Sequence, residues 1–225
     1  MQKEHHSRIE RSSQIKTRVK RGCLIIFVCT FNRCRSAIAE YFLCKLLQQD
    51  YKNLADSILV SSAGIVTEDV VQLSNQLGIP VPAFGGHPPQ QIIDICLNSG
   101  IDISSHRSTP FNGKMAKRAQ LIITMEDVQK AAILTRYPQS HRKVFTFREV
   151  FGISGATVIE DSLNIPAYIS DIRDYAFSDE FARQTVSQIE QYLKQGMNKI
   201  LALLEYTSTN NCGCPKSSRP SLQKY

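Results

Sequence analysis

Short, continuous apolar runs recur along the chain, and segments with helical periodicity separate them. Runs rich in branched and aromatic residues are typical of strands that are buried on both faces of a parallel sheet. Four such strands are predicted, at Leu24–Val28, Ile58–Ser62, Leu121–Met125 and Lys143–Phe147. Each of them ends at polar or glycine-containing sequence, so each is expected to be followed by a loop.

Between and after these runs, apolar residues recur at the spacing of one helical face. The predicted helices are Ser36–Gln49, Pro89–Ser99, Asp127–Thr135 and Ser178–Leu204. The last one is long and contains Gly196, which would allow a kink. Because strands alternate with helices, the sequence predicts an α/β fold with a four-stranded parallel sheet that carries helices on both faces.

Polar segments flank the alternating pattern at both ends. Residues 1–21 are basic and lack apolar periodicity, so they are predicted to form a disordered arm. Residues 207–225 are rich in Ser, Asn, Pro and Lys and predict a flexible tail. A single folded domain is therefore expected at residues 22–206.

The composition is that of a globular protein with a substantial core, since 42% of the residues are hydrophobic and 21% are charged. The formal net charge is +7, but much of the excess lies in residues 1–21. A nucleic-acid partner is therefore not expected. No apolar run approaches the ~20 residues that span a bilayer, so we expect a cytoplasmic protein without membrane association. The oligomeric state stays open.

The cysteines also favour a reducing compartment, because their number is odd and their spacing does not suggest a disulfide framework. They are Cys23, Cys29, Cys34, Cys44, Cys96, Cys212 and Cys214. Cys212 and Cys214 enclose one glycine, and a solvated tail is the simpler interpretation than a metal or redox pair. The sequence predicts no metal site and no cofactor.

The most unusual residues follow the first predicted strand, in Cys29-Thr30-Phe31-Asn32-Arg33-Cys34-Arg35-Ser36. In parallel α/β sheets, ligands bind at the carboxyl ends of the strands. A curled loop and a helix N-terminus present backbone N–H groups to an oxyanion, and the planar guanidinium of Arg35 can bind two phosphate oxygens. Cys29 could then attack phosphorus and form a phosphocysteine. The alternative is a chance spacing around a buried, inert cysteine.

This loop resembles the signature Cys-x-Gly-Asn-x-Cys-Arg-Ser of the low-molecular-weight protein-tyrosine-phosphatase family, and Ala39-Glu40 match the Ala-Glu that follows it. Three later segments resemble family landmarks in the same order: Val60–Gly64, Gly100–Ser108 and Ala119–Glu126. The resemblance implies a phosphatase that hydrolyses phosphotyrosine in phosphorylated proteins through a phosphocysteine intermediate. It assigns Cys29 as nucleophile and Arg35 as phosphate clamp, within a loop that binds phosphate through Thr30, Phe31, Asn32, Arg33, Cys34, Arg35 and Ser36.

The resemblance also suggests roles for three further residues. Asn32 and Ser36 should brace the loop and the thiolate through hydrogen bonds. Cys34 matches a second loop cysteine that can form a reversible disulfide with the nucleophile, although an inert packed thiol is an equal alternative. His106 lies in one of the matching segments and is expected to be structural, because the nucleophile already has activating groups nearby.

Two loop residues depart from the family pattern. Phe31 replaces the usual glycine, so it would be strained if the position requires a positive φ; otherwise its ring could form a wall of the pocket. Thr30 follows the nucleophile, as in the bacterial phosphoarginine phosphatases and the related arsenate reductases. A phosphoarginine phosphatase is therefore a second hypothesis. An arsenate reductase and a non-catalytic phosphate-binding module are weaker ones.

A phosphotyrosine leaving group needs a proton, which a positioned carboxylic acid supplies. The family carries this acid in an Asp-Pro pair shortly before the last helix, and this chain has no such pair. Asp171 is the first candidate and Asp174 the second, counted back from the helix start at Ser178. Tyr175 and Phe177 could border an aromatic substrate slot or pack on the body. Alternatively, Asp171 and Asp174 are both solvated loop residues, and the chain lacks the general acid of the family.

Overall fold

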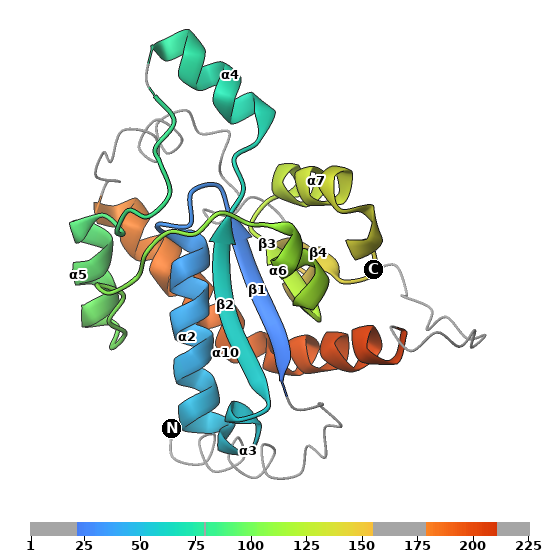
Figure 1. Cartoon of the computed structure of the whole chain (residues 1–225). Coiled ribbons are helices and arrows are strands. Elements are labelled where there is room, and N and C mark those ends of the chain that lie inside the picture. Colours follow the sequence, from blue (N-terminus) through green and yellow to red (C-terminus); the bar gives the residue numbers. More distant parts are fainter. Residues whose placement is uncertain (1–21, 79, 155–178, 211–225) are drawn as a thin grey trace.

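The computed structural model describes residues 22–78, 80–154 and 179–210, and within these ranges four parallel strands form one sheet. The strand order is β2-β1-β3-β4, so β1 is central (Figure 1). The strands are β1 (Cys23–Cys29), β2 (Ile58–Gly64), β3 (Leu121–Thr124) and β4 (Val144–Thr146). The predicted α/β class with a four-stranded parallel sheet is confirmed.

Helices cover both faces of this sheet, as predicted (Figure 1). One face packs against α2 (Arg35–Asp50), α5 (Gln90–Asn98) and α10 (Asp179–Asn210), and the other against α6 (Gly113–Arg118) and α7 (Asp127–Arg136). The remaining described helices are short or peripheral: α3 (Lys52–Ala55), α4 (Glu68–Leu77), η1 (Pro138–Ser140) and α8 (Phe147–Phe151). None of the helices in the described ranges is both long and apolar enough to cross a membrane.

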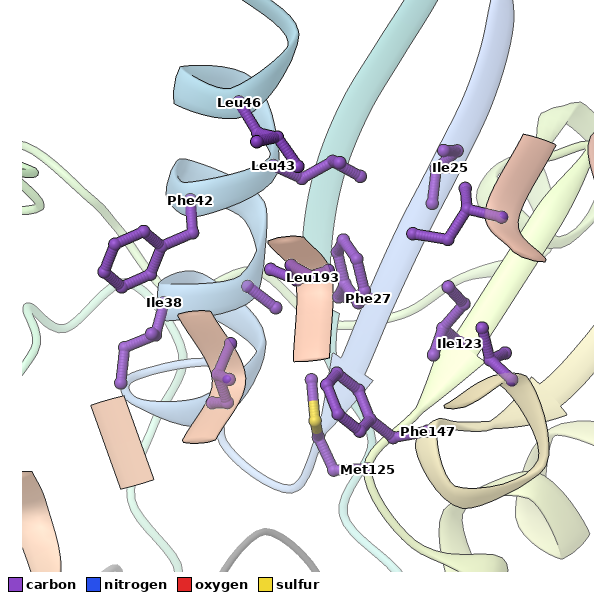
Figure 2. Packing of buried hydrophobic residues seen from close by; sticks show 14 of the residues in the cluster. Ile25, Phe27, Ile38, Phe42, Leu43, Leu46, Ile123, Met125, Phe147 and Leu193 are labelled. Carbon is purple, nitrogen blue, oxygen red and sulfur yellow. The ribbon is translucent and has the colours of Figure 1, made fainter. Parts of the chain in front are cut away.

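The central strand is buried on both faces because its side chains alternate between two apolar clusters. Ile25 and Phe27 point into the larger cluster, and Ile26 and Val28 into the smaller one. Figure 2 shows Phe27 of β1 between side chains of α2 and α10. The continuous apolar run of β1 thus has a physical cause, since neither face of the strand meets water.

The closing helix differs from its predicted bounds. It ends at Asn210 rather than Leu204, so the expected boundary between domain and tail at residue 206 falls inside α10. The helix continues through Gly196, where a Cβ atom would lie 2.2 Å from the ring of Phe151. Gly196 therefore provides room for Phe151, which is a packing role that the sequence pattern did not reveal.

The predicted fourth strand also ends early, at Thr146. The Thr146 hydroxyl accepts a hydrogen bond from the Glu149 amide at 3.1 Å, and the Glu149 carboxylate accepts one from the Thr146 amide at 2.7 Å. This capping box starts α8, so Phe147 is the first residue of a helix and not the last of a strand. The predicted arm, residues 1–21, lies outside the described residues.

Candidate active site

The candidate site lies in the loop between β1 and α2, at the carboxyl edge of the sheet (Figure 1). Cys29 is the last residue of β1, and its carbonyl accepts a hydrogen bond from the Ile65 amide at 2.9 Å. Arg35 is the first residue of α2. The strand and the helix thus fix both ends of the loop, as the sequence pattern predicted.

Two polar groups contact the Cys29 thiol. The Ser36 hydroxyl lies 3.0 Å from Cys29 Sγ, and the backbone N–H of Asn32 donates to the same sulfur at 3.3 Å. The residue is only 3% exposed. The thiolate is the nucleophilic form of cysteine, and the Asn32 N–H is a donor that can contact it.

Asn32 gives the loop its shape. It has a φ of 56° and is the one non-glycine residue with positive φ in the described ranges. Its side-chain amide donates to Ser36 Oγ at 3.0 Å and to Ser62 Oγ at 2.7 Å, while its Oδ1 accepts from the Thr109 amide at 2.8 Å. Asparagine tolerates this backbone region better than most residues, so conformation and hydrogen bonding agree at this position.

His106 and Glu40 extend this arrangement. We use the name Asn32 network for Asn32, Ser36, Glu40, Ser62 and His106. Burial lowers the pKa of His106, so its ring is neutral at pH 7 and its Nε2–H donates to the Asn32 carbonyl at 2.8 Å. Burial raises the pKa of Glu40, whose carboxylate accepts from Ser62 Oγ. The His106 Nδ1 atom lies 4.0 Å from Glu40 Oε2. His106 contacts the loop backbone rather than the thiol, which agrees with a structural role.

A second set of contacts holds Arg35. Its guanidinium forms an ion pair with Glu126, and both side chains are nearly buried. Glu126 precedes α7, and its amide and that of Met125 donate to the side-chain oxygen of Gln129. Gln129 in turn donates to the Thr30 hydroxyl at 3.3 Å. We call Thr30, Arg35, Glu126 and Gln129 the Arg35 network.

Phe31 resolves the question raised by its departure from the family pattern. The positive φ belongs to Asn32, so Phe31 carries no left-handed strain. Its side chain is 4% exposed and packs in a small apolar cluster with Val70 of α4, to which Val66, Leu73 and Val81 contribute. The ring therefore faces α4.

The other loop residues are also placed. Arg33 Nε donates to the His87 carbonyl at 2.6 Å. Cys34 is 6% exposed and belongs to the larger core cluster. Phe31, Arg33 and Cys34 thus contact neighbours outside the loop, whereas Ser36 Oγ and the Asn32 amide contact the Cys29 thiol.

Several predicted residues fall outside the described ranges. Asp171 and Asp174, the two candidates for the general acid, are among them, as are Tyr175, Phe177, Cys212 and Cys214. Within residues 22–78, 80–154 and 179–210, no three His, Cys, Asp or Glu side chains gather in a way that could hold a metal ion.

The sequence analysis missed two groups that the structure brings to the loop. Glu126 lies in a segment that matched the family, but nothing in its spacing from Arg35 marks it as the partner of the clamp. Ser62 and Glu40 are similar cases, because 22 residues separate the two partners of this hydrogen bond. The only available signal was the position of Ser62 and Glu126 at or just beyond strand ends, where functional residues of α/β proteins gather.

Comparison with known proteins agrees with this geometry. The model of the low molecular weight phosphotyrosine protein phosphatase family matches residues 24–205. A probable low molecular weight protein-tyrosine-phosphatase, EpsP of Ralstonia nicotianae, is 32% identical over 127 residues, which are 56% of this chain and 71% of EpsP. The protein-arginine-phosphatase of Bacillus subtilis is 23% identical over 171 residues, which are 76% of this chain and 92% of that relative.

A solved structure shows the same fold. The low molecular weight protein tyrosine phosphatase from T. tengcongensis superimposes with a TM-score of 0.59 at 23% identity, covering 79% of this chain and 99% of that one. The family match spans most of the chain and includes the loop, both networks and the sheet. The chain therefore belongs to the low molecular weight phosphotyrosine protein phosphatase family, a family of hydrolases.

Proposed function

We propose that this chain dephosphorylates phosphotyrosine in proteins, with Cys29 as nucleophile, Arg35 as phosphate clamp and Asp171 as general acid. The observation that carries the proposal is the pair of polar contacts at the Cys29 thiol, from Ser36 Oγ and from the Asn32 amide, which donates to the sulfur. The Arg35 guanidinium supports it, because its five N–H donors suffice for Glu126 on one edge and phosphate oxygens on another.

The reaction then runs in two displacements. The Cys29 thiolate attacks phosphorus, an S–P bond forms, and the P–O bond to tyrosine breaks while Asp171 gives its proton to the leaving oxygen. Water next attacks phosphorus and passes a proton to the Asp171 carboxylate. The S–P bond breaks, inorganic phosphate leaves, and the thiolate returns. Backbone N–H groups of residues 30–36 and Arg35 stabilise the charge on the phosphate oxygens in both steps.

The general acid can be tested separately from the loop. Asp171→Asn should lower turnover of phenolic phosphates by roughly the 10²–10⁴-fold that is typical of general acid catalysis. The defect should shrink for leaving groups that depart without a proton, and Asp174→Asn is the matched control with the smaller effect. If Asp174→Asn were the crippling change and Asp171→Asn were silent, the assignment of the acid would be wrong.

Phosphoarginine is the second candidate substrate, and two observations favour it. Thr30 follows the nucleophile, and its buried hydroxyl has a fixed position because it accepts a hydrogen bond from Gln129. The relative that matches over 171 residues is a protein-arginine-phosphatase. The nitrogen leaving group of phosphoarginine is more basic than a phenolate and takes up its proton differently, so Asp171→Asn should matter less for it.

One experiment decides between these substrates. The purified full chain is assayed on a phosphotyrosine peptide and a phosphoarginine peptide of the same sequence, in excess chelator. The proposal predicts a higher kcat/KM for phosphotyrosine and no loss of activity with chelator. A higher kcat/KM for the phosphoarginine peptide would show that phosphoarginine, and not phosphotyrosine, is the substrate. Phosphate binding without turnover of either peptide would identify a non-catalytic binding module.

The proposal also places the enzyme in the cytoplasm, where a nucleophilic thiol stays reduced. No disulfide joins two of the cysteines in residues 22–78, 80–154 and 179–210, which is compatible with a reducing compartment. Cell fractionation tests this point, and recovery of the protein in an oxidising compartment would contradict it.

A further inference from the structure

A group of exposed cations lies on the side of the sheet that α6 covers. Two stretches of the chain, residues 103–125 and residues 128–148, contain no aspartate or glutamate, and they include α6 and the connection from α7 through η1 to β4. Among the residues that the structure describes, no carboxylate forms an ion pair with the four exposed cations that we call the basic patch. They are Lys114, Lys117, Arg118 and Arg142.

The patch is continuous because α6 and the start of β4 are held together. The ammonium group of Lys143, a buried residue, donates to the Ala119 carbonyl at 2.8 Å and to the Lys117 carbonyl at 3.3 Å. Lys143 directly follows Arg142 in the chain. The buried lysine therefore fixes Arg142 beside the end of α6, where Lys117 and Arg118 are exposed.

The end of α6 lies at the amino edge of the sheet, away from the phosphate loop. The Gln120 amide, just after α6, donates to the Leu24 carbonyl at 2.9 Å, and the Leu24 amide donates to Gln120 Oε1 at 2.6 Å. Leu24 is the second residue of β1, whereas the phosphate loop follows the last residue of that strand, Cys29 (Figure 1). A partner bound at Arg118 and Arg142 would therefore leave the loop accessible.

The sequence adds cations at the same edge, because residue 21 directly precedes the described part of the chain and the start of β1. Residues 11–21 contain five Lys or Arg residues and no carboxylate. Clusters of about four to eight cations are typical of segments that bind anionic lipid headgroups. Residues 1–21 contain no Phe, Tyr or Trp, which are the side chains on which proteins commonly stack single-stranded bases. The composition thus favours lipid headgroups over nucleic acid.

From these observations we propose that the basic patch and residues 11–21 together bind the surface of a membrane that contains anionic phospholipids. Surface binding of this kind is electrostatic and needs no spanning helix. Our expectation of no membrane association rested only on the lack of a spanning segment, so the proposal replaces it. The phosphate loop, at the opposite edge of the sheet, would face away from the lipid. The inference does not depend on the proposed function.

Co-sedimentation of the full chain with vesicles tests the proposal. Vesicles of equimolar phosphatidylcholine and phosphatidylserine should bind the chain, vesicles of phosphatidylcholine alone should not, and added salt should release the bound protein. In Arg118→Gln/Arg142→Gln, partitioning onto the phosphatidylserine vesicles should fall about 25-fold, because each cation near such a surface strengthens binding about fivefold. Lys16→Gln/Arg18→Gln should weaken binding to a similar extent.

The matched control is Arg107→Gln/Lys194→Gln, which removes the same charge from exposed side chains outside the patch and should bind like the wild type. Equal losses in this control and in the patch variant would show that only net charge matters. That result would overturn the inference, as would unchanged binding in the patch variant or no binding of the wild type to phosphatidylserine.

Two further measurements complete the test. Duplex DNA or RNA should not displace the chain from the vesicles at equal phosphate concentration, and displacement would make nucleic acid the partner and overturn the inference. Arg118→Gln/Arg142→Gln should hydrolyse p-nitrophenyl phosphate at the wild-type rate, which checks that the variant is folded. A wild-type protein that binds the vesicles but hydrolyses no phosphate ester would refute the proposed function and leave the membrane contact in place.

Discussion

The two networks that meet at the phosphate loop differ in the kind of group they hold. The Asn32 network fixes the backbone of the loop mainly through buried amide and hydroxyl groups: Asn32 and Ser36 are both 0% exposed, and the carboxylate of the network, Glu40, lies at its edge with 21% of its side chain exposed. The Arg35 network holds a charged side chain through a carboxylate, at the less buried end of the loop. The difference indicates that one network sets the shape of the site and the other sets its charge.

The distinction has a physical basis. Asn32 has a positive φ, and the polar atoms of its side chain are hydrogen-bonded to groups inside the protein. We therefore expect its conformation to stay the same when phosphate binds. The Arg35–Glu126 pair must share the guanidinium with an incoming dianion. Changes in the first network should therefore affect both stability and rate, whereas changes in the second should act mainly on the rate.

The largest effect within either network is expected for Arg35→Lys. Lysine keeps the positive charge but loses the planar fork that binds two phosphate oxygens, so kcat should fall by about 10²–10³-fold. Steady-state kinetics on a phosphotyrosine peptide measure this loss. Near-normal turnover in the variant would show that charge alone is sufficient and that the clamp does not operate.

Asn32→Ala should have the second largest effect on turnover, and unlike Arg35→Lys it should also lower the free energy of unfolding. It removes one of the two hydrogen-bond partners of Ser62 and the side-chain acceptor of the Thr109 amide, and it places alanine at a φ of 56°. We therefore expect about 2–4 kcal/mol of destabilisation together with a loss of turnover. Urea unfolding and kinetics on the same samples measure both.

The matched control is Asn112→Ala, which removes another asparagine that accepts from backbone amides, at the exposed start of α6. It should cost about 1 kcal/mol as a lost helix cap and leave turnover unchanged. If Asn32→Ala behaved like this control, the Asn32 network would not shape the site.

Glu126→Gln should have a smaller effect, confined to the rate. The substitution keeps the size and an acceptor oxygen but removes the charge that orients Arg35, so kcat/KM should fall by about tenfold. The unfolding free energy should change less than in Asn32→Ala. A variant that loses stability but retains full activity would reverse the roles assigned to the two networks.

The smallest effect concerns the pH dependence of stability at His106. Burial lowers the pKa of this ring below 6.5, so the folded state binds fewer protons than the unfolded state in the window just below 6.5. Its contribution to stability is therefore present above pH 6.5 and is lost as the pH falls through that window. The raised pKa of Glu40 acts in the opposite sense above 4.5.

The two contributions can be separated by comparing unfolding of wild type and His106→Gln at pH 7 and pH 5. The stability difference between the two proteins should shrink toward pH 5, because protonation places a charge on the buried His106 ring in the wild type alone. A difference that is constant with pH would show that His106 is not neutral in the folded state.

The sequence predicted the strands well because burial on both faces requires an unbroken apolar run, as in Leu24–Val28 of β1. It missed α4, although Val70, Leu73 and Leu77 recur there at helical spacing, and it missed α6, which is only six residues long. The capping box of Thr146 and Glu149 was visible in the sequence and would have marked the start of α8.

The site was predictable where its residues are neighbours in the chain and not where they come from separate elements. Cys29 through Ser36 form one continuous segment between a predicted strand and a predicted helix, so the sequence suggested an anion-binding loop. Glu126 is 91 residues from Arg35, and Thr109 is 77 from Asn32, so only the folded sheet brings them together. The place of Phe31 against α4 likewise depends on tertiary packing, which no local pattern encodes.

The central claim is that Cys29 carries the phosphoryl group during turnover, and rapid acid quench of the full chain with a phosphotyrosine substrate tests it most directly. Mass spectrometry of the quenched protein should locate one phosphoryl group on the peptide that contains Cys29. The label should accumulate further in Asp171→Asn if water activation slows, and no turnover should occur in Cys29→Ser, although that variant should still fold and bind phosphate. Turnover of Cys29→Ser near the wild-type rate, or a phosphoryl group on a different residue, would contradict the account.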